Sequence, residues 1–310
     1  MNSLSFSSSL ISVNLRNLRT SFFLIGGLFL FSLLNVSADN VKAVTWNLCW
    51  FPGRFPTAAL EEKQVQMKRA QSALQQIAPD IFLCQEVASW QAVEELSSVV
   101  PGLKPAVVSD FGPAAEGAPP QNVAIATKLP VISGWAQTWN ADGRTKYPLP
   151  RGFAFAAIEM PTKSSLLLVY SVHLKSNHRG ADRDQDDNAA MREESSKILR
   201  GHIKKMRAIY GKAYEHIGVL VGGDFNTSLD DERFKDEQTL RAFSKDGYTW
   251  GFANASYMDR ITIPGSKHSP LPPVSFDHFF TFGLGDPAAR VLPIKGVSDH
   301  LPVEMVILMK

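Results

Sequence analysis

The sequence predicts an α/β fold in which parallel and antiparallel strands occur together. Two apolar runs, residues 41–48 and 81–87, flank a helical segment at 60–77 that Pro79 ends. A strand, a helix and a second strand in this order form a right-handed crossover, so the two strands lie parallel and end at the same edge of their sheet. Three later runs have the spacing of hairpin-connected antiparallel strands, at 122–128, 151–160 and 166–173.

The rest of the chain predicts further elements around this frame. Helices are expected over 90–99 and over 191–210, where Leu199, Ile203 and Met206 recur on one face, and a charged helix-like segment covers 230–245. Further strands are expected at 219–224, 275–281 and 289–292 and in the last run towards residue 309. Loops are expected at 111–120, 177–190 and 264–273.

Residues 1–38 predict a secretory signal peptide that is cleaved after Ala38. The segment contains no acidic residue, and Arg16 and Arg19 precede a short apolar run that ends in small residues. The alternative is an uncleaved membrane anchor, but the run at 21–34 is short for a span of roughly 20 residues. We therefore expect a secreted or periplasmic protein without a stable membrane anchor.

The predicted mature chain, residues 39–310, forms one domain without net charge. No internal repeat or linker divides it. The whole chain has 32 Lys+Arg and 30 Asp+Glu, and removal of Arg16 and Arg19 leaves equal numbers. The global basic excess typical of a nucleic-acid-binding protein is therefore missing, although a local basic patch remains compatible with the composition. A monomer is expected.

The only two cysteines, Cys49 and Cys84, are expected to be buried free thiols. If Asn47 and Glu86 stand side by side on parallel strands, the two thiols are offset by about four residues, or roughly 13 Å. A disulfide requires Cα atoms about 6 Å apart.

The run 219–227 predicts a chemically active strand end. An apolar β-branched segment reaches Gly222 and Gly223 and then presents Asp224 and Asn226, which at this spacing share one side of an extended chain. Glycine lets a phosphate or a metal-bound water approach the backbone, Asp supplies a hard anionic oxygen, and an Asn amide can bind a phosphate oxygen. The alternative is a strand followed by an ordinary polar turn.

Other apolar strands end in the same way. Taken singly, each histidine among these residues is better explained as a structural residue. Taken together, carboxylates, imidazoles and amides without a thiolate suit a hard divalent cation such as Mg²⁺ rather than Zn²⁺. The residues in question are Asn47, Glu86, His173, Asp224, Asn226, Asp277, Asp299 and His300.

Six motifs in a fixed order resemble the endonuclease/exonuclease/phosphatase superfamily, which has the deoxyribonuclease I-like fold. They are Trp46-Asn47, Gln85-Glu86, the run 171–176, the run 223–226, Phe276-Asp277-His278 and Ser298-Asp299-His300. The resemblance covers nearly all of residues 41–305. It implies a four-layer α/β sandwich, with two mixed β-sheets packed face to face, helices outside and the site at one rim. It also implies metal-dependent hydrolysis of phosphate esters.

The resemblance also implies roles for individual residues. Glu86 corresponds to the principal Mg²⁺ ligand, with Asn47 and Asp299 close to the metal, and Mn²⁺ or Ca²⁺ are alternative ions. Asp224 and Asn226 position the water and the phosphate. His300, held by Asp277, acts as general base or as its electrostatic equivalent, His173 contacts the phosphate or the leaving oxygen, and Arg151 matches a basic position that binds phosphate.

Nucleic acid is the substrate that the sequence favours. The strand end at 173–176, together with Arg151, His178 and Arg179, brings cationic and hydrogen-bonding groups towards one rim. The alternatives are a sphingomyelinase-like or other small-molecule or lipid phosphodiesterase and, from another class, a catalytically inactive binding module on the same fold. The candidates for a lipid-binding apolar segment, Trp50-Phe51 and residues 135–139, are better explained by buried or loop-packing positions. The intact motif set argues against an inactive module.

Overall fold

The computed structural model describes residues 40–113, 119–177, 185–265, 272–285 and 287–308. The expected signal peptide with its cleavage point after Ala38 lies outside the described residues, as do His178 and Arg179. None of the helices within the described ranges combines the length and the apolar content that are needed to span a bilayer.

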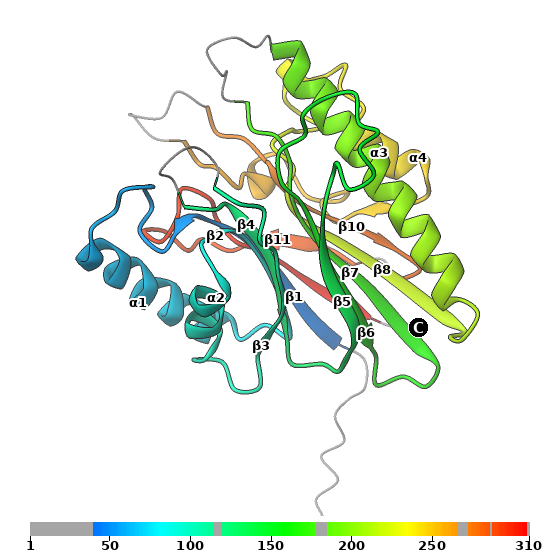
Figure 1. Ribbon diagram of the computed structural model, residues 1–310, viewed down its shortest axis with the longest axis horizontal. Coiled ribbons are helices and arrows are strands. Elements are labelled where there is room, and N and C mark those ends of the chain that lie inside the picture. Colours follow the sequence, from blue (N-terminus) through cyan, green and yellow to red (C-terminus); the bar gives the residue numbers. More distant parts are fainter. Residues whose placement is uncertain (1–39, 114–118, 178–184, 266–271, 286, 309–310) are drawn as a thin grey trace, which may run out of the picture. The chain divides into compact units, whose positions relative to one another are not determined.

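Twelve strands of the described residues form two six-stranded mixed sheets (Figure 1). The first sheet has the order β11 (Ala289–Val291), β12 (Val303–Leu308), β1 (Asn40–Phe51), β2 (Ile81–Val87), β4 (Asn122–Thr127) and β3 (Lys104–Val108). The second has the order β5 (Val131–Thr138), β6 (Gly152–Glu159), β7 (Ser165–His173), β8 (His216–Asp224), β10 (Asp277–Phe282) and β9 (Thr249–Trp250).

The predicted crossover is confirmed. Strand β1, helix α1 (Leu60–Ile77) and strand β2 follow one another, and β1 and β2 pair in parallel, with Asn47 opposite Gln85. Glu61 and Glu62 in the first turn of α1 complement the positive end of its helix dipole. The helix ends at Ala78, whose left-handed conformation allows its amide N–H to reach the carbonyl of Leu74.

Helices cover the outer faces of both sheets. Helices α1 and α2 (Trp90–Ser97) lie on one side, and α3 (Gln185–Tyr210) and α4 (Arg241–Lys245) lie on the other (Figure 1). Between the sheets, Leu83 and Val303 of the first sheet share one core cluster with Leu220 and Phe279 of the second. The predicted four-layer α/β sandwich is therefore confirmed.

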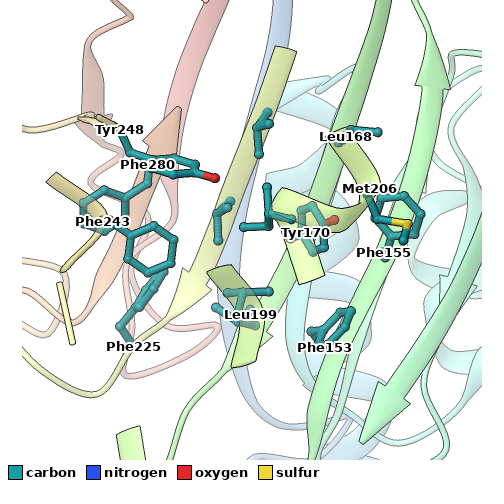
Figure 2. Packing of buried hydrophobic residues seen from close by; sticks show 14 of the residues in the cluster. Phe153, Phe155, Leu168, Tyr170, Leu199, Met206, Phe225, Phe243, Tyr248 and Phe280 are labelled. Atoms are coloured by element: carbon teal, nitrogen blue, oxygen red, sulfur yellow. The ribbon is translucent and has the colours of Figure 1, made fainter. Parts of the chain in front are cut away.

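An aromatic cluster beneath α3 and α4 fixes the end of β8. Phe225, Phe243 and Phe280 lie together in Figure 2, and the rings of Phe243 and Phe280 stack with centroids 4.7 Å apart. Phe225 is fully buried in this cluster, and its amide donates to the carbonyl of Phe276 at 2.9 Å. Because successive side chains of an extended chain alternate in direction, burial of Phe225 directs Asp224 to the opposite side.

Several expected elements differ from the structure. Helix α3 begins at Gln185 rather than at residue 191, and the helix-like segment at 230–245 contains only a 3₁₀ turn, η1 (Glu232–Phe234), and the short α4. The sequence analysis did not identify β3, β5 and β9, which are edge strands of the two sheets. Edge strands are short, tolerate residues such as Pro105 and Gly134, and lack the continuous apolar character of central strands.

The cysteine prediction is confirmed in part. Both cysteines are free thiols. Cys84 is buried inside β2, whereas Cys49 is only partly buried. Cys49 follows the point where β1 leaves its regular pairing with β2.

Candidate active site

The polar strand ends meet at one edge of the two sheets. In the second sheet, Asp224 is the register partner of His173 on β7 and of Asp277 on β10. In the first sheet, Asn47 is the residue of β1 after which its regular pairing with β2 breaks, and Glu86 is the penultimate residue of β2. The sheet packing brings these two groups within hydrogen-bond distance of each other.

Asn47 connects the carboxylates of the two sheets. Its side-chain nitrogen lies 3.1 Å from Glu86 Oε1 and 2.8 Å from Asp224 Oδ2 and donates to both. Its side-chain oxygen accepts the amide N–H of Cys49 at 3.0 Å. One amide side chain therefore sets the distance between a carboxylate of the first sheet and a carboxylate of the second.

His300 and Asp277 form a buried pair. His300 Nδ1 lies 2.7 Å from Asp277 Oδ2, and His300 Nε2 lies 3.9 Å from Asp224 Oδ2. Burial by itself lowers the pKa of His300, but the carboxylates of Asp277 and Asp224 outweigh this effect and hold the pKa well above its ordinary value. The two carboxylates therefore favour the form of His300 that carries a proton on both ring nitrogens.

The protonation of Asp224 is coupled to that of His300 and Asp277. Burial raises its pKa to about 7, with His300 opposing the rise and Asp277 adding to it. Its two oxygens are both engaged, because Oδ1 accepts the amide N–H of Asn226 at 2.8 Å and Oδ2 accepts the amide of Asn47. Asp224, Asp277 and His300 therefore titrate as a coupled set rather than as three separate groups.

His173 is the neutral imidazole of the site. Burial lowers its pKa well below the ordinary value, and the nearby charges of Arg151 and His300 lower it further. His173 Nε2 lies 3.6 Å from Asp224 Oδ2 and 3.7 Å from Glu86 Oε1. Its Nδ1 is buried without a hydrogen-bond partner among the described residues. The two carboxylates thus favour the tautomer that carries its proton on Nε2.

Arg151 lies beside the site but is already engaged by the backbone. Its guanidinium donates to the carbonyls of His173 at 3.0 Å and Leu174 at 2.6 Å, and to Gln121 Oε1 at 3.0 Å. The structure therefore gives Arg151 a clamping position at the end of β7. A direct contact with phosphate requires it to release one of these three bonds.

Asn226 and Asp299 complete the set that the sequence analysis singled out. The side-chain nitrogen of Asn226 donates to the Leu174 carbonyl at 3.2 Å, which leaves its side-chain oxygen available. Asp299 is exposed, and its Oδ1 lies 3.2 Å from the Ser298 hydroxyl. The same hydroxyl lies 2.8 Å from the Asn47 carbonyl, which links the 298–300 loop to the end of β1.

A buried ion pair between Arg192 and Glu237 supports the site. Arg192 of α3 donates to Glu237 Oε1 at 2.9 Å and to Oε2 at 2.6 Å. Its third nitrogen donates to Asn177 Oδ1 at 3.0 Å, and Asn177 in turn donates to the Asn226 carbonyl at 2.8 Å. The chain of bonds thus runs from a buried carboxylate to Asn226, two residues beyond the end of β8.

His278, next to Asp277, is a structural histidine. Its Nε2 lies 3.0 Å from the Thr227 carbonyl, and its Nδ1 accepts the indole N–H of Trp250 at 3.2 Å. Burial lowers its pKa to about 4. These two bonds fix the neutral form with the proton on Nε2.

Backbone strain is concentrated around the site. A left-handed backbone is uncommon for residues other than glycine and costs on the order of 1–3 kcal/mol at each position. Such conformations cluster at functional sites, where the surrounding structure enforces them. Non-glycine residues with positive φ at or beside the site are Cys49, Trp50, Glu86, Arg151 and Asn226.

Some supporting residues were not identified from the sequence. The amide N–H of Trp50 donates to Glu86 Oε2 at 2.9 Å, and the Thr262 hydroxyl accepts the amide N–H of Asp277 at 3.2 Å. Thr262 and Asp277 are 15 residues apart. Asn177 and Arg192 were also missed. Each acts through a contact that depends on the tertiary structure, and no local pattern marks it.

The donor set fits a hard divalent cation. Oxygen ligands of the kind that Mg²⁺ prefers come from Glu86, Asp224, Asp277 and Asp299, and Asp277 Oδ1 is buried without a hydrogen-bond partner among the described residues. Burial raises the pKa of the Cys49 thiol, and Asp299 and Glu86 raise it further, so this sulfur stays protonated. A soft thiolate ligand is therefore not offered.

Three other residues of the site, among those that the structure describes, also form a compact group of possible ligands. Ligand atoms of Asp224, Asp277 and His300 all lie within 4.8 Å of one another. The predicted ligands were Asn47, Glu86 and Asp299. Because His300 Nδ1 is already bonded to Asp277, the compact group is better suited to holding protons than to holding an ion.

The fold is a two-sheet α/β sandwich with carboxylates, amides and imidazoles at one edge, and these groups suit phosphate-ester chemistry. A family model described as the Endonuclease/Exonuclease/phosphatase family matches residues 44–300. The chain belongs to this family, and the resemblance that the six motifs indicated is confirmed. Hydrolysis of phosphate esters is the general activity of the family.

Solved structures confirm the fold at low sequence identity. The crystal structure of SmcL is 16% identical over 86% of this chain and 99% of its own, with a TM-score of 0.59. Truncated TDP2 from Caenorhabditis elegans is 14% identical over 87% of this chain and 98% of its own, with a TM-score of 0.59. A family protein from Bacteroides thetaiotaomicron has 14% identity over 87% and 98% of the two chains and a TM-score of 0.61. No match is found among curated proteins.

Proposed function

We propose that this chain is a secreted, divalent-metal-dependent phosphodiesterase that hydrolyses nucleic acid. The observation that carries the proposal is the position of His300, whose Nδ1 lies 2.7 Å from Asp277 Oδ2 and whose Nε2 lies 3.9 Å from Asp224 Oδ2, beside the Asn47–Glu86 contact. This arrangement places a cation, a carboxylate with a pKa of about 7 and a hard-ion donor set at one edge of the fold. Hydrolysis of a phosphodiester calls for these three components, because its anionic oxygens repel a nucleophile.

Glu86, Asn47 and Asp299 are the residues proposed to hold the metal ion. Mg²⁺ is the preferred ion, with Mn²⁺ and Ca²⁺ as alternatives. Bound there, the ion supplies Lewis-acid stabilisation of the charge that develops on the phosphate oxygens.

Four residues of the chain have separate roles in the hydrolysis. Water attacks phosphorus, and a carboxylate oxygen of Asp224 accepts its proton, which a pKa of about 7 allows at neutral pH. His300 donates a hydrogen bond from Nε2 to a phosphate oxygen and stabilises the added negative charge. Asn226 binds another phosphate oxygen, and His173 hydrogen-bonds the phosphate or the leaving oxygen through Nε2. As the ester P–O bond breaks, the leaving oxygen takes up a proton from solvent water, and Asp224 returns its proton to solvent afterwards.

The choice of nucleic acid has local support. Arg151 and Asn226 both contact the backbone at Leu174, so cationic and amide groups adjoin the strand end that faces the proposed phosphate site. Secretion rests on the composition of residues 1–38 alone.

The test is hydrolysis of plasmid DNA, single-stranded DNA, RNA and sphingomyelin side by side, with Mg²⁺, with Mn²⁺ and with EDTA. We expect cleavage of nucleic acid that EDTA abolishes and that weakens as the salt concentration rises. Rapid sphingomyelin hydrolysis without cleavage of any nucleic acid would refute the substrate assignment. Activity that survives EDTA would refute the metal dependence. Recovery of full-length protein, uncleaved after Ala38, in the membrane fraction of the expressing cells would refute the proposed secretion.

A further inference from the structure

A pocket of about 300 Å³ lies next to the candidate active site. Its walls come from residues 50–56, from α1, from the beginning of α2 and from Pro119 and Pro120. Helices α1 and α2 lie together on the outer side of the first sheet (Figure 1). No step of the proposed hydrolysis uses this pocket.

The pocket wall is bonded directly to two residues of the site. The amide N–H of Trp50 donates to Glu86 Oε2 at 2.9 Å, and the amide N–H of Cys49 donates to Asn47 Oδ1 at 3.0 Å. Cys49 and Trp50 both have left-handed backbones, with φ of 55° and 50°. Two such residues in succession are strained, so the site residues hold Trp50 in its place against the pocket. A group that occupies the pocket is therefore a near neighbour of a phosphate at Glu86.

The chemistry of the lining suits a flat ring with polar edges. Trp50, Phe55 and the two prolines at 119 and 120 provide ring faces, and the side chain of Phe55 remains 60% exposed in the free protein. Gln91 and Glu95 add hydrogen-bonding groups. A volume near the lower end of the usual range for ligand pockets admits one ring system rather than an extended chain.

An acyl chain fits the same lining poorly. Lys63 and Glu95 are exposed charged residues that line the pocket, and Glu61 and Glu62 of the first turn of α1 are exposed close by. Insertion of this rim into a lipid bilayer would bring these charges out of water at considerable cost. A base can stack on an aromatic side chain while the charged residues around it stay hydrated, and such stacking is typical of proteins that bind single-stranded nucleic acid.

We propose that this pocket binds one unpaired nucleobase adjacent to the scissile phosphate, with Phe55 and Trp50 as stacking partners. The inference rests on the proposed hydrolysis of nucleic acid and extends it to the form of the substrate. A base inside a duplex reaches such a pocket only after it has left the stack, which costs free energy. The protein therefore prefers single-stranded DNA or RNA to duplexes of the same sequence.

A cycle of two changes tests the contact. The first is Phe55→Ala in the protein, and the second is an abasic nucleotide at one position of a single-stranded oligonucleotide that wild-type protein cleaves. Each change alone should lower kcat/KM at the bond beside that position about tenfold, as expected for the loss of one stacked base. The two together should cost little more than either one, because both remove the same contact.

Matched controls separate stacking from structural damage. Phe55→Tyr keeps a ring and should restore cleavage next to an intact base. Ile132→Ala alters an exposed apolar residue of β5, outside the pocket lining, and should behave as wild type. Cleavage of a duplex of the same sequence by wild-type protein should be slower than cleavage of the single strand.

The outcomes distinguish this inference from the proposed function. Additive losses in the cycle, or faster cleavage of duplex than of single strands, overturn the base pocket and leave a nuclease in place. Hydrolysis of bis(p-nitrophenyl) phosphate without cleavage of any nucleic acid overturns the proposed nuclease and the base pocket with it. A Phe55→Ala variant that loses sphingomyelin hydrolysis in vesicles assigns the pocket to lipid instead.

Discussion

Replacement of Arg192 by methionine should destabilise the protein by about 3–5 kcal/mol, the usual cost of leaving one charge of a buried ion pair without its partner. Arg192 is buried, and the side chain of Glu237 is only 3% exposed. Without the guanidinium, the Glu237 carboxylate loses both of its bonds to Arg192 and keeps the Thr239 hydroxyl at 2.6 Å. For a domain of this size, the loss corresponds to a decrease in Tm of roughly 10 °C.

The double variant Arg192→Met/Glu237→Leu measures how much of the lost unfolding free energy is caused by the unpaired charge of Glu237. It removes both charges and should recover most of the stability that the single variant loses. The free energy of unfolding is obtained from urea denaturation followed by tryptophan fluorescence. A single variant that loses less than about 1 kcal/mol, or a double variant that shows the sum of both single losses, would refute the reasoning.

The same variant also tests whether the ion pair supports the site. Arg192 positions Asn177, which bonds to the Asn226 carbonyl. Loss of this support should lower kcat by between about 10- and 100-fold at a temperature well below the Tm of the variant. Unchanged kcat in a folded Arg192→Met protein would show that Asn226 is held independently of Arg192.

Three further predictions concern individual residues of the site and its surroundings. Glu86→Gln should lower kcat/KM roughly 100-fold or more without a change in Tm, because a hard cation loses its anionic ligand; near-wild-type turnover at saturating Mg²⁺ contradicts the assignment. If Asp277 and His300 act as one unit, the double alanine variant should lose little more activity than the worse single variant, whereas additive losses mean separate roles. His278 has a pKa of about 4 in the folded protein against an ordinary value of 6.5, so it binds a proton more readily in the unfolded chain. Its contribution to the free energy of unfolding is therefore complete above pH 6.5 and is lost as the pH falls to 4. Between pH 7 and pH 4 the wild type should therefore lose about 3 kcal/mol more unfolding free energy than His278→Gln, and parallel pH profiles contradict this.

The central elements of the fold could be predicted because they carry a strong pattern. Strands β1 and β2 are buried along most of their length and read as continuous apolar runs, and α1 between them ends before a proline. The first turns of α3 were missed because residues 185–190 are polar or small and lack apolar periodicity. The edge strands have too little buried surface to impose a pattern.

The candidate site could be predicted only in part, because the sequence shows where each strand ends but not which strand ends meet. Each polar residue follows an apolar run, so its position at a strand end is visible in the sequence. The contact between Asn47 and Asp224 joins two different sheets over 177 residues, and no local signal indicates which strand ends meet. The left-handed backbone at Glu86 and Asn226 is likewise imposed by tertiary contacts. The four-layer arrangement came from the resemblance and not from periodicity.

The pairing of β1 with β12 has a consequence for folding kinetics. Asn40 is opposite Leu308, and the indole N–H of Trp46 donates to the His300 carbonyl at 3.0 Å across 254 residues. Such contacts raise the contact order and require a large loop to close, which slows folding. During synthesis, β1 leaves the ribosome long before its partner exists and presents an unpaired edge until residues 303–308 emerge. Enzymatic activity should therefore appear only after residues 303–308 have left the ribosome, later than the secondary structure of β1, α1 and β2.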